Sequence, residues 1–157
     1  MQPLLKNDLL YLLRILESVE KIMLYTCNFE DALEFFDAND GKEFNACLTL
    51  LTQIGEEANK ISNELKTKYP DVDWNKVKDF RNRIVHDYTG LDRFITFDIV
   101  KQQVPLLKSA IAGIIRKELN AGNFDKEEFR IAATSPIYDM LILKVWRTIN
   151  CKTMFEC

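Results

Sequence analysis

Apolar residues recur every three or four positions along four stretches of the chain. The first stretch runs from about residue 4 to 26 and the second from about residue 42 to 67. The third begins at Trp74 and ends just past Tyr88, and the fourth runs from Ile95 or Asp98 to Leu119. This spacing places the apolar side chains on one face of an α-helix. The pattern therefore predicts four amphipathic helices.

The residues between these stretches predict where the helices begin and end. Pro70 stops the second helix, because proline disfavours a helical conformation in the residue before it. Asp73 is placed to cap the start of the third helix, and Gly90 to end it. Pro105 is expected to bend the fourth helix or to split off a first turn. Four such helices with short connections pack most simply as an antiparallel four-helix bundle, so the fold class is all-α.

Two segments are less regular than the rest. The stretch from Phe29 to Phe36 is a candidate for a short helix in the first connection. Residues 120–123, Asn-Ala-Gly-Asn, have the composition of a linker and divide a bundle domain, residues 1–119, from a C-terminal extension, residues 120–157. The apolar run from Ile137 to Trp146 suits a helix or a strand, so the structure of the extension stays open.

Composition indicates a protein that folds without cross-links. Hydrophobic residues make up 47% of the 157, which is enough for a sizeable core. The four cysteines show no CxxC spacing and no accompanying histidine cluster, so we expect reduced thiols, no metal and no other cofactor. The N-terminus lacks the features of a signal peptide and no stretch has the roughly 18 apolar residues of a membrane span. We therefore expect a cytoplasmic protein that does not contact a membrane.

Charge is unevenly distributed, although the net charge is only −3. Residues 28–43 are strongly acidic, whereas residues 74–86 are locally basic. A chain with a net negative charge is not expected to coat nucleic acid through bulk electrostatics. A polyanion would instead be held at the basic segment. Ordinary solvated helix faces are the alternative explanation of both stretches.

The chain has a single histidine, His86, and it lies in the octet Arg-Asn-Arg-Ile-Val-His-Asp-Tyr, residues 81–88. Histidine is the side chain that titrates nearest to neutral pH, and arginine grips phosphate with two parallel hydrogen bonds. This pairing suits chemistry on a phosphodiester: His86 would accept or donate a proton, and Arg81 would stabilise charge on the phosphoryl oxygens. A histidine that only caps a helix or donates a hydrogen bond is the alternative.

Further residues are candidates for supporting or RNA-binding roles: Glu56, Lys78, Asn82 and Arg83. Arg83 would hold a flanking phosphate, or would pair with Asp87 four residues later. Glu56 would orient Arg81 across the bundle, or would lie exposed on the second helix. The sequence leaves both choices open.

The spacing within the octet favours a dimer. Arg81 and His86 lie about 140° apart around an ideal helix, whereas Arg81 and Tyr88 lie on nearly the same face. Either the helix distorts near its end, or a second protomer supplies one of the two groups to a shared phosphate. The residue types allow attack of a ribose 2′-hydroxyl on the adjacent phosphorus without a metal, which predicts specificity for RNA because DNA lacks that hydroxyl.

The octet resembles the motif of the HEPN superfamily of helical-bundle ribonucleases. That motif is an arginine, four to six residues, a histidine, one residue and a tyrosine, and here Arg81, His86 and Tyr88 occupy its three positions. Residues 54–60, Ile-Gly-Glu-Glu-Ala-Asn-Lys, then Tyr69-Pro70 and Trp74 precede the octet in the order seen in the HepT toxin branch. The likeness covers residues 4 to about 118 and does not cover the tail from Asn120.

The resemblance implies a dimeric, metal-independent endoribonuclease toxin that acts on RNA such as tRNA or mRNA. It implies catalytic roles for Arg81 and His86. It also implies an MNT-type nucleotidyltransferase antitoxin that silences the toxin by transferring AMP to the motif tyrosine, here Tyr88. Two alternatives remain: a catalytically inactive HEPN bundle that serves as a binding or scaffolding module, and a plain helical adaptor whose octet is only surface charge.

Overall fold

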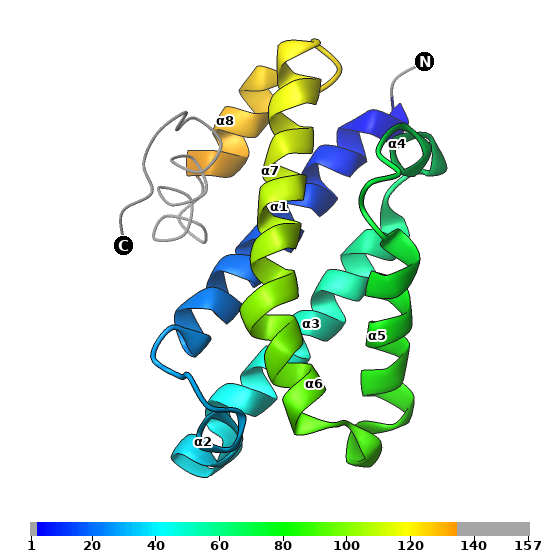
Figure 1. The fold of residues 1–157 in the computed structure, drawn as a ribbon. Helices are drawn as coiled ribbons and strands as arrows, with labels where there is room; N and C mark the ends of the chain where they lie inside the picture. The colour runs from blue at the N-terminus through cyan, green and yellow to red at the C-terminus, as the bar shows by residue number, and fades with distance from the viewer. Residues whose placement is uncertain (1–2, 135–157) are drawn as a thin grey trace.

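The computed structural model describes residues 3–134, and the regular structure within them is helical throughout. Four long helices make up most of it: α1 (Pro3–Thr26), α3 (Lys42–Lys60), α5 (Trp74–His86) and α7 (Val104–Asn120). Consecutive long helices run in opposite directions (Figure 1). The prediction of an all-α antiparallel four-helix bundle is therefore confirmed.

The core lies where the apolar faces of these helices meet. Helix α1 packs against α3 and α7, and α5 packs against α3. The most deeply buried side chains come from the predicted apolar faces, among them Leu12, Val19, Cys47, Ile111 and Ile115. Burial of such side chains contributes roughly 1.5–3 kcal/mol each relative to exposure, which holds the bundle together.

Shorter elements close the two ends of the bundle. They are α2 (Ala32–Asp37), η1 (Ala38–Gly41), α4 (Asn63–Lys68), η2 (Tyr88–Gly90), α6 (Arg93–Asp98), the π-helical η3 (Ile99–Gln103) and α8 (Lys126–Thr134). Helices α2 and α6 lie at one end and α4 at the other (Figure 1). Helix α2 confirms the short helix expected between Phe29 and Phe36, and Asp31 caps it by accepting hydrogen bonds from the N–H groups of Leu33 and Glu34.

The prediction of one continuous helix from residue 42 to 67 is wrong. Helix α3 ends at Lys60, and Ser62 caps α4 by accepting a hydrogen bond from the N–H of Leu65 at 3.2 Å. The carboxylate of Asp8 on α1 accepts hydrogen bonds from both the N–H and the hydroxyl of Ser62, at 2.9 and 2.5 Å. A contact between residues 54 positions apart therefore stabilises the break, and helical periodicity alone does not reveal it.

The start of α5 follows the prediction, but its end does not. The Asp73 carboxylate accepts a hydrogen bond from the N–H of Lys76 at 2.9 Å, as expected of a cap. The helix ends at His86, where the N–H of Asp87 donates to the carbonyl of Arg83 at 2.9 Å. Gly90 does not adopt the left-handed conformation of a helix-ending glycine; its N–H instead closes the short turn η2. Tyr88 therefore lies outside α5.

The fourth predicted helix is interrupted before Pro105 by a π-helical turn, while the backbone on both sides of that turn stays in the right-handed helical region. Pro105 lies in the first turn of α7, directly after the π-helical segment η3. Proline has no N–H to donate, and its ring crowds the carbonyl four residues earlier, so a wider turn before it relieves the crowding.

The chain continues to pack against the bundle after α7. Gly122 has a positive φ of 75°, which turns the chain, and the N–H of Asn123 donates to the carbonyl of Glu118 at 2.9 Å. Phe124 and Phe129 are buried in the core. The proposed boundary between residues 119 and 120 stays a prediction, and the apolar run from Ile137 to Trp146 lies outside the described residues. Within residues 3–134, no helix has the length and apolar character needed to cross a membrane.

Candidate active site

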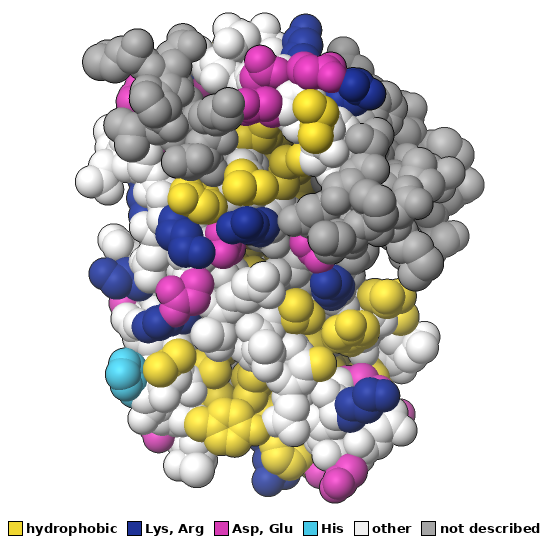
Figure 2. All heavy atoms as spheres, turned by 180° about the vertical axis from the view of Figure 1, so that it is seen from behind, with side chains coloured by type: hydrophobic (Ala, Val, Ile, Leu, Met, Phe, Trp, Pro, Cys, Tyr) yellow, Lys and Arg dark blue, Asp and Glu magenta, His cyan; other side chains and the backbone are white. Residues whose placement is uncertain are grey.

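The octet lies at the C-terminal end of α5 and continues into η2. Figure 2 shows the single histidine, in cyan, at the edge of the molecule, with lysine and arginine side chains further along that edge and apolar side chains gathered near it. Arg81 and Asn82 are partly buried, whereas Arg83 and His86 are exposed. The octet is thus a surface segment whose first two residues are partly buried and whose later residues, apart from Ile84, are exposed.

Arg81 is held by a network of hydrogen bonds. Its Nε donates to Oε1 of Glu56 at 2.8 Å, and Nη2 donates to the same oxygen. Nη1 donates to Oδ1 of Asn82 at 2.9 Å. Of the two alternatives for Glu56, the contact across the bundle with Arg81 is the one observed. About a quarter of the Arg81 side chain, 24%, stays exposed and accessible to a ligand.

A close approach of α3 to α5 brings these residues together. A Cβ atom placed on Gly55 would lie 2.3 Å from Cβ of Arg81, a distance that real Cβ atoms do not adopt. Only glycine fits here, because its hydrogen leaves room for the arginine stem. The close helix contact that Gly55 permits also places Glu56, the next residue, within reach of the guanidinium.

His86 does not contact Arg81. It is the last residue of α5, its side chain is exposed, and α5 stays helical up to that point. Among the described residues, no hydrogen bond joins the two side chains. The helix therefore does not distort to close the pair on one phosphate.

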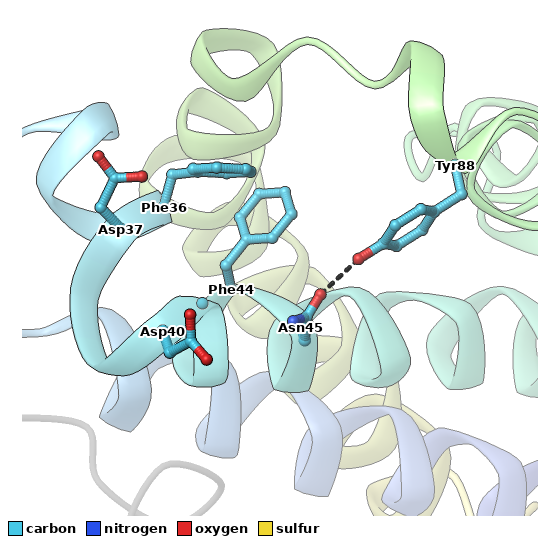
Figure 3. A pocket seen from close by; sticks show the side chains of 7 residues that line it. Phe36, Asp37, Asp40, Phe44, Asn45 and Tyr88 are labelled. Atoms are coloured by element: carbon cyan, nitrogen blue, oxygen red, sulfur yellow. Dashed lines mark hydrogen bonds between the residues drawn. The ribbon is translucent and has the colours of Figure 1, made fainter.

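Tyr88 is anchored by a residue that the sequence did not single out. Its hydroxyl donates to Oδ1 of Asn45 on α3 at 2.5 Å, while 53% of the residue stays exposed (Figure 3). Asn45 is 43 residues earlier in the chain and looks like any exposed polar residue of an amphipathic helix. No sequence pattern distinguishes it.

The remaining candidates, Lys78 and Arg83, are exposed on α5. Within the described part of the chain, Arg83 forms no ion pair with Asp87, so that alternative is not observed. Burial lowers the pKa of Lys66, and the positive charge of Lys78 lowers it further. Lys78 therefore extends the positive field of α5 toward α4.

The cysteines that the structure describes are free thiols. Cys27 is exposed, whereas Cys47 is in the core, where burial and the nearby Glu43 raise the pKa of its thiol to about 12. Cys151 and Cys157 lie outside the described residues. Across residues 3–134, no group of three or more histidine, cysteine, aspartate or glutamate side chains is arranged to hold a metal ion.

This arrangement combines an exposed imidazole, an anchored and partly open guanidinium and a phenol within one surface strip. Such groups can transfer a proton and stabilise a phosphoryl oxygen. The strip lies open on the surface rather than in a deep cavity, which suits an extended polymer better than an enclosed small molecule.

Comparison with known proteins gives a consistent result. Residues 15–114 match a family described as "Ribonuclease HepT-like". A protein of Methanocaldococcus jannaschii named as a candidate RNase is 33% identical over 101 residues, which cover 64% of this chain and 90% of that protein. A Thermococcus cleftensis protein named "Probable ribonuclease HepT" is 33% identical over 100 residues, 62% of this chain and 86% of that one. No solved structure matches at a comparable level of significance.

Proposed function

Because the chain belongs to the HepT-like ribonuclease family, we propose that it is an endoribonuclease with Arg81 and His86 as its catalytic residues. The observation that carries the proposal is the guanidinium of Arg81, anchored by Glu56 and Asn82 yet partly open, on the helix that ends in the exposed His86. The names of the relatives, which include ribonuclease HepT, support the activity.

The proposed reaction uses the 2′-hydroxyl of the substrate as the nucleophile. One His86 imidazole accepts the 2′ proton as the oxygen attacks the adjacent phosphorus, and a protonated imidazole donates a proton to the departing 5′ oxygen. The products are a 2′,3′-cyclic phosphate and a free 5′-hydroxyl. Arg81 stabilises the negative charge that grows on the phosphoryl oxygens. Lys78, Asn82 and Arg83 would hold or orient the strand, and no metal takes part in these steps.

A homodimer supplies the complete site in this proposal. Arg81 and His86 do not meet within one protomer, so a two-fold partner would bring its own copies to the same cleft. Large apolar side chains are exposed around the end of α5 and in α6: Val85 at 49%, Phe94 at 61% and Ile95 at 49%. Apolar groups that lie unpartnered beside a proposed active site are suited to burial between two protomers.

Tyr88 is the proposed point of control. The residue is 53% exposed and lies two residues from His86, and an MNT-type nucleotidyltransferase antitoxin would transfer AMP to its hydroxyl. The transfer joins the phenolic oxygen to the α-phosphorus of ATP and releases pyrophosphate. The added negative charge next to His86 would repel the phosphates of RNA and silence the toxin.

The test is cleavage of total tRNA and a small mRNA by purified protein, expressed without a partner, in excess EDTA. We expect the parent protein to cleave, and His86→Ala and Arg81→Ala, with folds verified by circular dichroism, to lose at least about a hundredfold in rate. Arg116→Ala is the matched control, because Arg116 is an exposed arginine on α7 away from the octet. A folded, unmodified dimer that leaves all these RNAs intact would reject the proposal and favour a binding module.

A further inference from the structure

A hollow of about 220 Å³ adjoins Tyr88 at the end of the bundle where α2 lies. Its lining comes from α2, η1, the first turn of α3 and η2: Phe36, Asp37, Asp40, Gly41, Phe44, Asn45 and Tyr88. Figure 3 shows Tyr88 on one side, the two carboxylates on the other and Asn45 between them. Its size suits a planar heterocycle better than a whole nucleotide.

The charges of the lining disfavour a phosphate in this hollow, although the guanidinium of Arg93 lies 3.9 Å from the centroid of the Phe36 ring that lines it. Asp37 and Asp40 contribute carboxylates and no lysine or arginine lines the hollow. Within the described residues neither carboxylate is paired with a cation. A phosphate would meet like charge here, so a ligand of the hollow is a neutral or cationic group rich in hydrogen-bond donors.

The polar atoms of the hollow form a specific set. The carboxylates of Asp37 and Asp40 only accept hydrogen bonds. Oδ1 of Asn45 is already occupied by the Tyr88 hydroxyl, which leaves Nδ2 of Asn45 as a donor. A ligand with two adjacent hydrogen-bond donors, facing a carboxylate, and a nearby acceptor, facing Nδ2 of Asn45, would therefore complement the lining. Guanine has this arrangement, since its N1–H and 2-amino groups lie side by side, with O6 next to them. Adenine and cytosine would instead turn a ring-nitrogen acceptor toward a carboxylate.

The backbone holds Asp40 in place by an unusual conformation. Asn39, Asp40 and Gly41 all have positive φ values, of 49°, 59° and 77°. Such angles cost free energy in residues other than glycine, and strained backbone of this kind clusters at functional sites. The strained turn fixes the carboxylate of Asp40 at the rim of the hollow.

The hollow is within reach of a strand at the proposed active site. Tyr88 follows His86 by two residues, so their Cα atoms lie within about 7 Å. The exposed ring of Tyr88 offers a face on which a base can stack, which is a common way for proteins to bind bases of single-stranded RNA. A base next to the cleaved phosphate could therefore enter the hollow while its phosphate stays on the basic side of α5.

From these observations we infer that the hollow beside Tyr88 binds the base of a nucleotide flanking the cleaved phosphate, with a preference for guanine. The inference rests on the proposed ribonuclease function. In it, Tyr88 stacks on the base, Asp40 accepts from N1–H and the 2-amino group, and Nδ2 of Asn45 donates to O6. An AMP group on the Tyr88 hydroxyl would stand beside the hollow and obstruct its entrance, so modification would block binding of the substrate base as well as add charge.

The first test needs no cleavage. The protein is titrated with guanosine, inosine, adenosine and arginine amide, while amide NMR signals of Gly41 and the Asn45 side chain are followed. We expect guanosine to shift both signals at concentrations where inosine, which lacks the 2-amino group, and adenosine bind roughly tenfold more weakly. If arginine amide shifts these NMR signals and none of the nucleosides does, the base site is overturned and a basic protein side chain is indicated as the ligand.

The second test uses cleavage by Asp40→Asn beside the matched control Asp71→Asn. Asparagine tolerates the left-handed conformation of residue 40, and Asp71 is exposed outside the hollow, so both variants lose one charge without added backbone strain. Oligonucleotides carry guanine or inosine at each position flanking a mapped cut. We expect the parent and Asp71→Asn to prefer guanine at one position by roughly tenfold in kcat/KM, and Asp40→Asn to lose that preference.

The outcomes separate the two proposals. Cleavage that depends on Arg81 and His86, with equal base preferences in Asp40→Asn and Asp71→Asn, would reject the base site and leave the ribonuclease intact. Absence of all cleavage would reject the ribonuclease, and the base site with it as stated here, even if guanosine bound. Two results together would support both the ribonuclease and the base site: guanosine binds, and only Asp40→Asn abolishes the preference for guanine.

Discussion

Two candidate site residues of the octet are each held by one residue of α3. Glu56 accepts hydrogen bonds from Arg81, and Asn45 accepts one from Tyr88. Both contacts leave part of the functional side chain exposed. The third group, His86, has no such anchor on α3 within the described residues. At the scale of single residues, α3 therefore orients the arginine and the tyrosine, while the side chain of the histidine is not held by α3.

The anchoring of Arg81 gives a first prediction. Glu56→Gln keeps the shape of the side chain and one acceptor oxygen but removes the charge, so the guanidinium is held by weaker hydrogen bonds. We expect kcat for RNA cleavage to fall roughly tenfold, because a misplaced arginine stabilises the transition state less. KM should stay the same or decrease, since a negative charge near the phosphate is gone.

Steady-state kinetics and thermal unfolding check this prediction. The ion pair is partly exposed, so the free energy of unfolding should change by only about 0–1 kcal/mol. Glu64→Gln on α4, which is exposed and away from the octet, is the control. An unchanged kcat in Glu56→Gln would show that Glu56 does not position Arg81.

At the scale of elements, α3 and α5 pack so closely at Gly55 that no larger residue fits there. Gly55→Ala would place a methyl group 2.3 Å from Cβ of Arg81 and force the helices apart. We expect this variant to lose about 1–3 kcal/mol in the free energy of unfolding and to lose RNA cleavage together with the Arg81–Glu56 contact.

Gly113→Ala is the matched control for that variant. Gly113 lies within α7, and a Cβ there has no atom within 4 Å. The free energy of unfolding of this variant should rise by about 0.5–1 kcal/mol, because alanine loses less backbone entropy than glycine when a helix forms. Urea unfolding of both variants measures these changes in the free energy of unfolding. A Gly55→Ala variant as stable and active as the parent would contradict the close packing of the helices.

The opposite end of the bundle depends on a buried carboxylate. Glu118 on α7 accepts hydrogen bonds from the hydroxyl of Tyr69, from Nζ of Lys68 at 2.6 Å and from Nδ2 of Asn123 at 2.8 Å. Burial raises the pKa of Glu118, but these hydrogen bonds outweigh burial and hold the pKa below its ordinary value. Burial and the hydrogen bond to Glu118 raise the pKa of Tyr69 to about 12.

A dependence of stability on pH follows from Tyr69. In the unfolded chain a tyrosine loses its proton near pH 10, whereas folded Tyr69 keeps it until about pH 12. The hydrogen bond therefore stabilises the fold fully below about pH 10, and this contribution is lost as pH rises toward 12. We expect Tyr69→Phe to be about 1–2 kcal/mol less stable than the parent near pH 8, with a difference that shrinks between pH 10 and 12.

Urea unfolding from pH 8 to 12 measures this difference. Tyr25→Phe is the control, because the Tyr25 hydroxyl has no hydrogen-bond partner within the described residues. A difference between Tyr69→Phe and the parent that stays constant across the range would show that the Tyr69 proton is not linked to folding.

At the scale of the whole molecule, the proposed site lies where surfaces of different character meet. The basic side of α5 borders the acidic segment of residues 28–43 near Tyr88, and exposed apolar side chains lie on α6. RNA is expected on the basic surface and a second protomer on the apolar one. Assembly and catalysis would then be coupled through the same end of the bundle.

This coupling predicts the behaviour of a charged interface variant. Phe94→Asp introduces a carboxylate at a side chain that is 61% exposed in the single chain, so its fold should be unchanged while a dimer would bury the charge. We expect a monomer by light scattering and a loss of RNA cleavage. Leu24→Asp on α1, at a residue that is 51% exposed, should leave both the mass and the activity unchanged. A dimeric Phe94→Asp variant would place the interface elsewhere.

Much of this protein follows from the sequence by itself, because the physics involved is local. Apolar periodicity determined the four long helices, Asp73 the start of α5, and Pro105 the break before α7. The octet also indicated where the arginine, histidine and tyrosine would lie along the chain.

Only the tertiary structure decided which distant residues complete the site. Asp8 stabilises the break at Ser62, Gly55 sets the approach of α5, and Asn45 anchors Tyr88. Periodicity reports which face of a helix is buried, but it does not say which helix packs there or how closely. Exposed polar residues such as Asn45 are alike in sequence until the fold gives one of them a partner. The hollow beside Tyr88 exists only because four separate elements meet there.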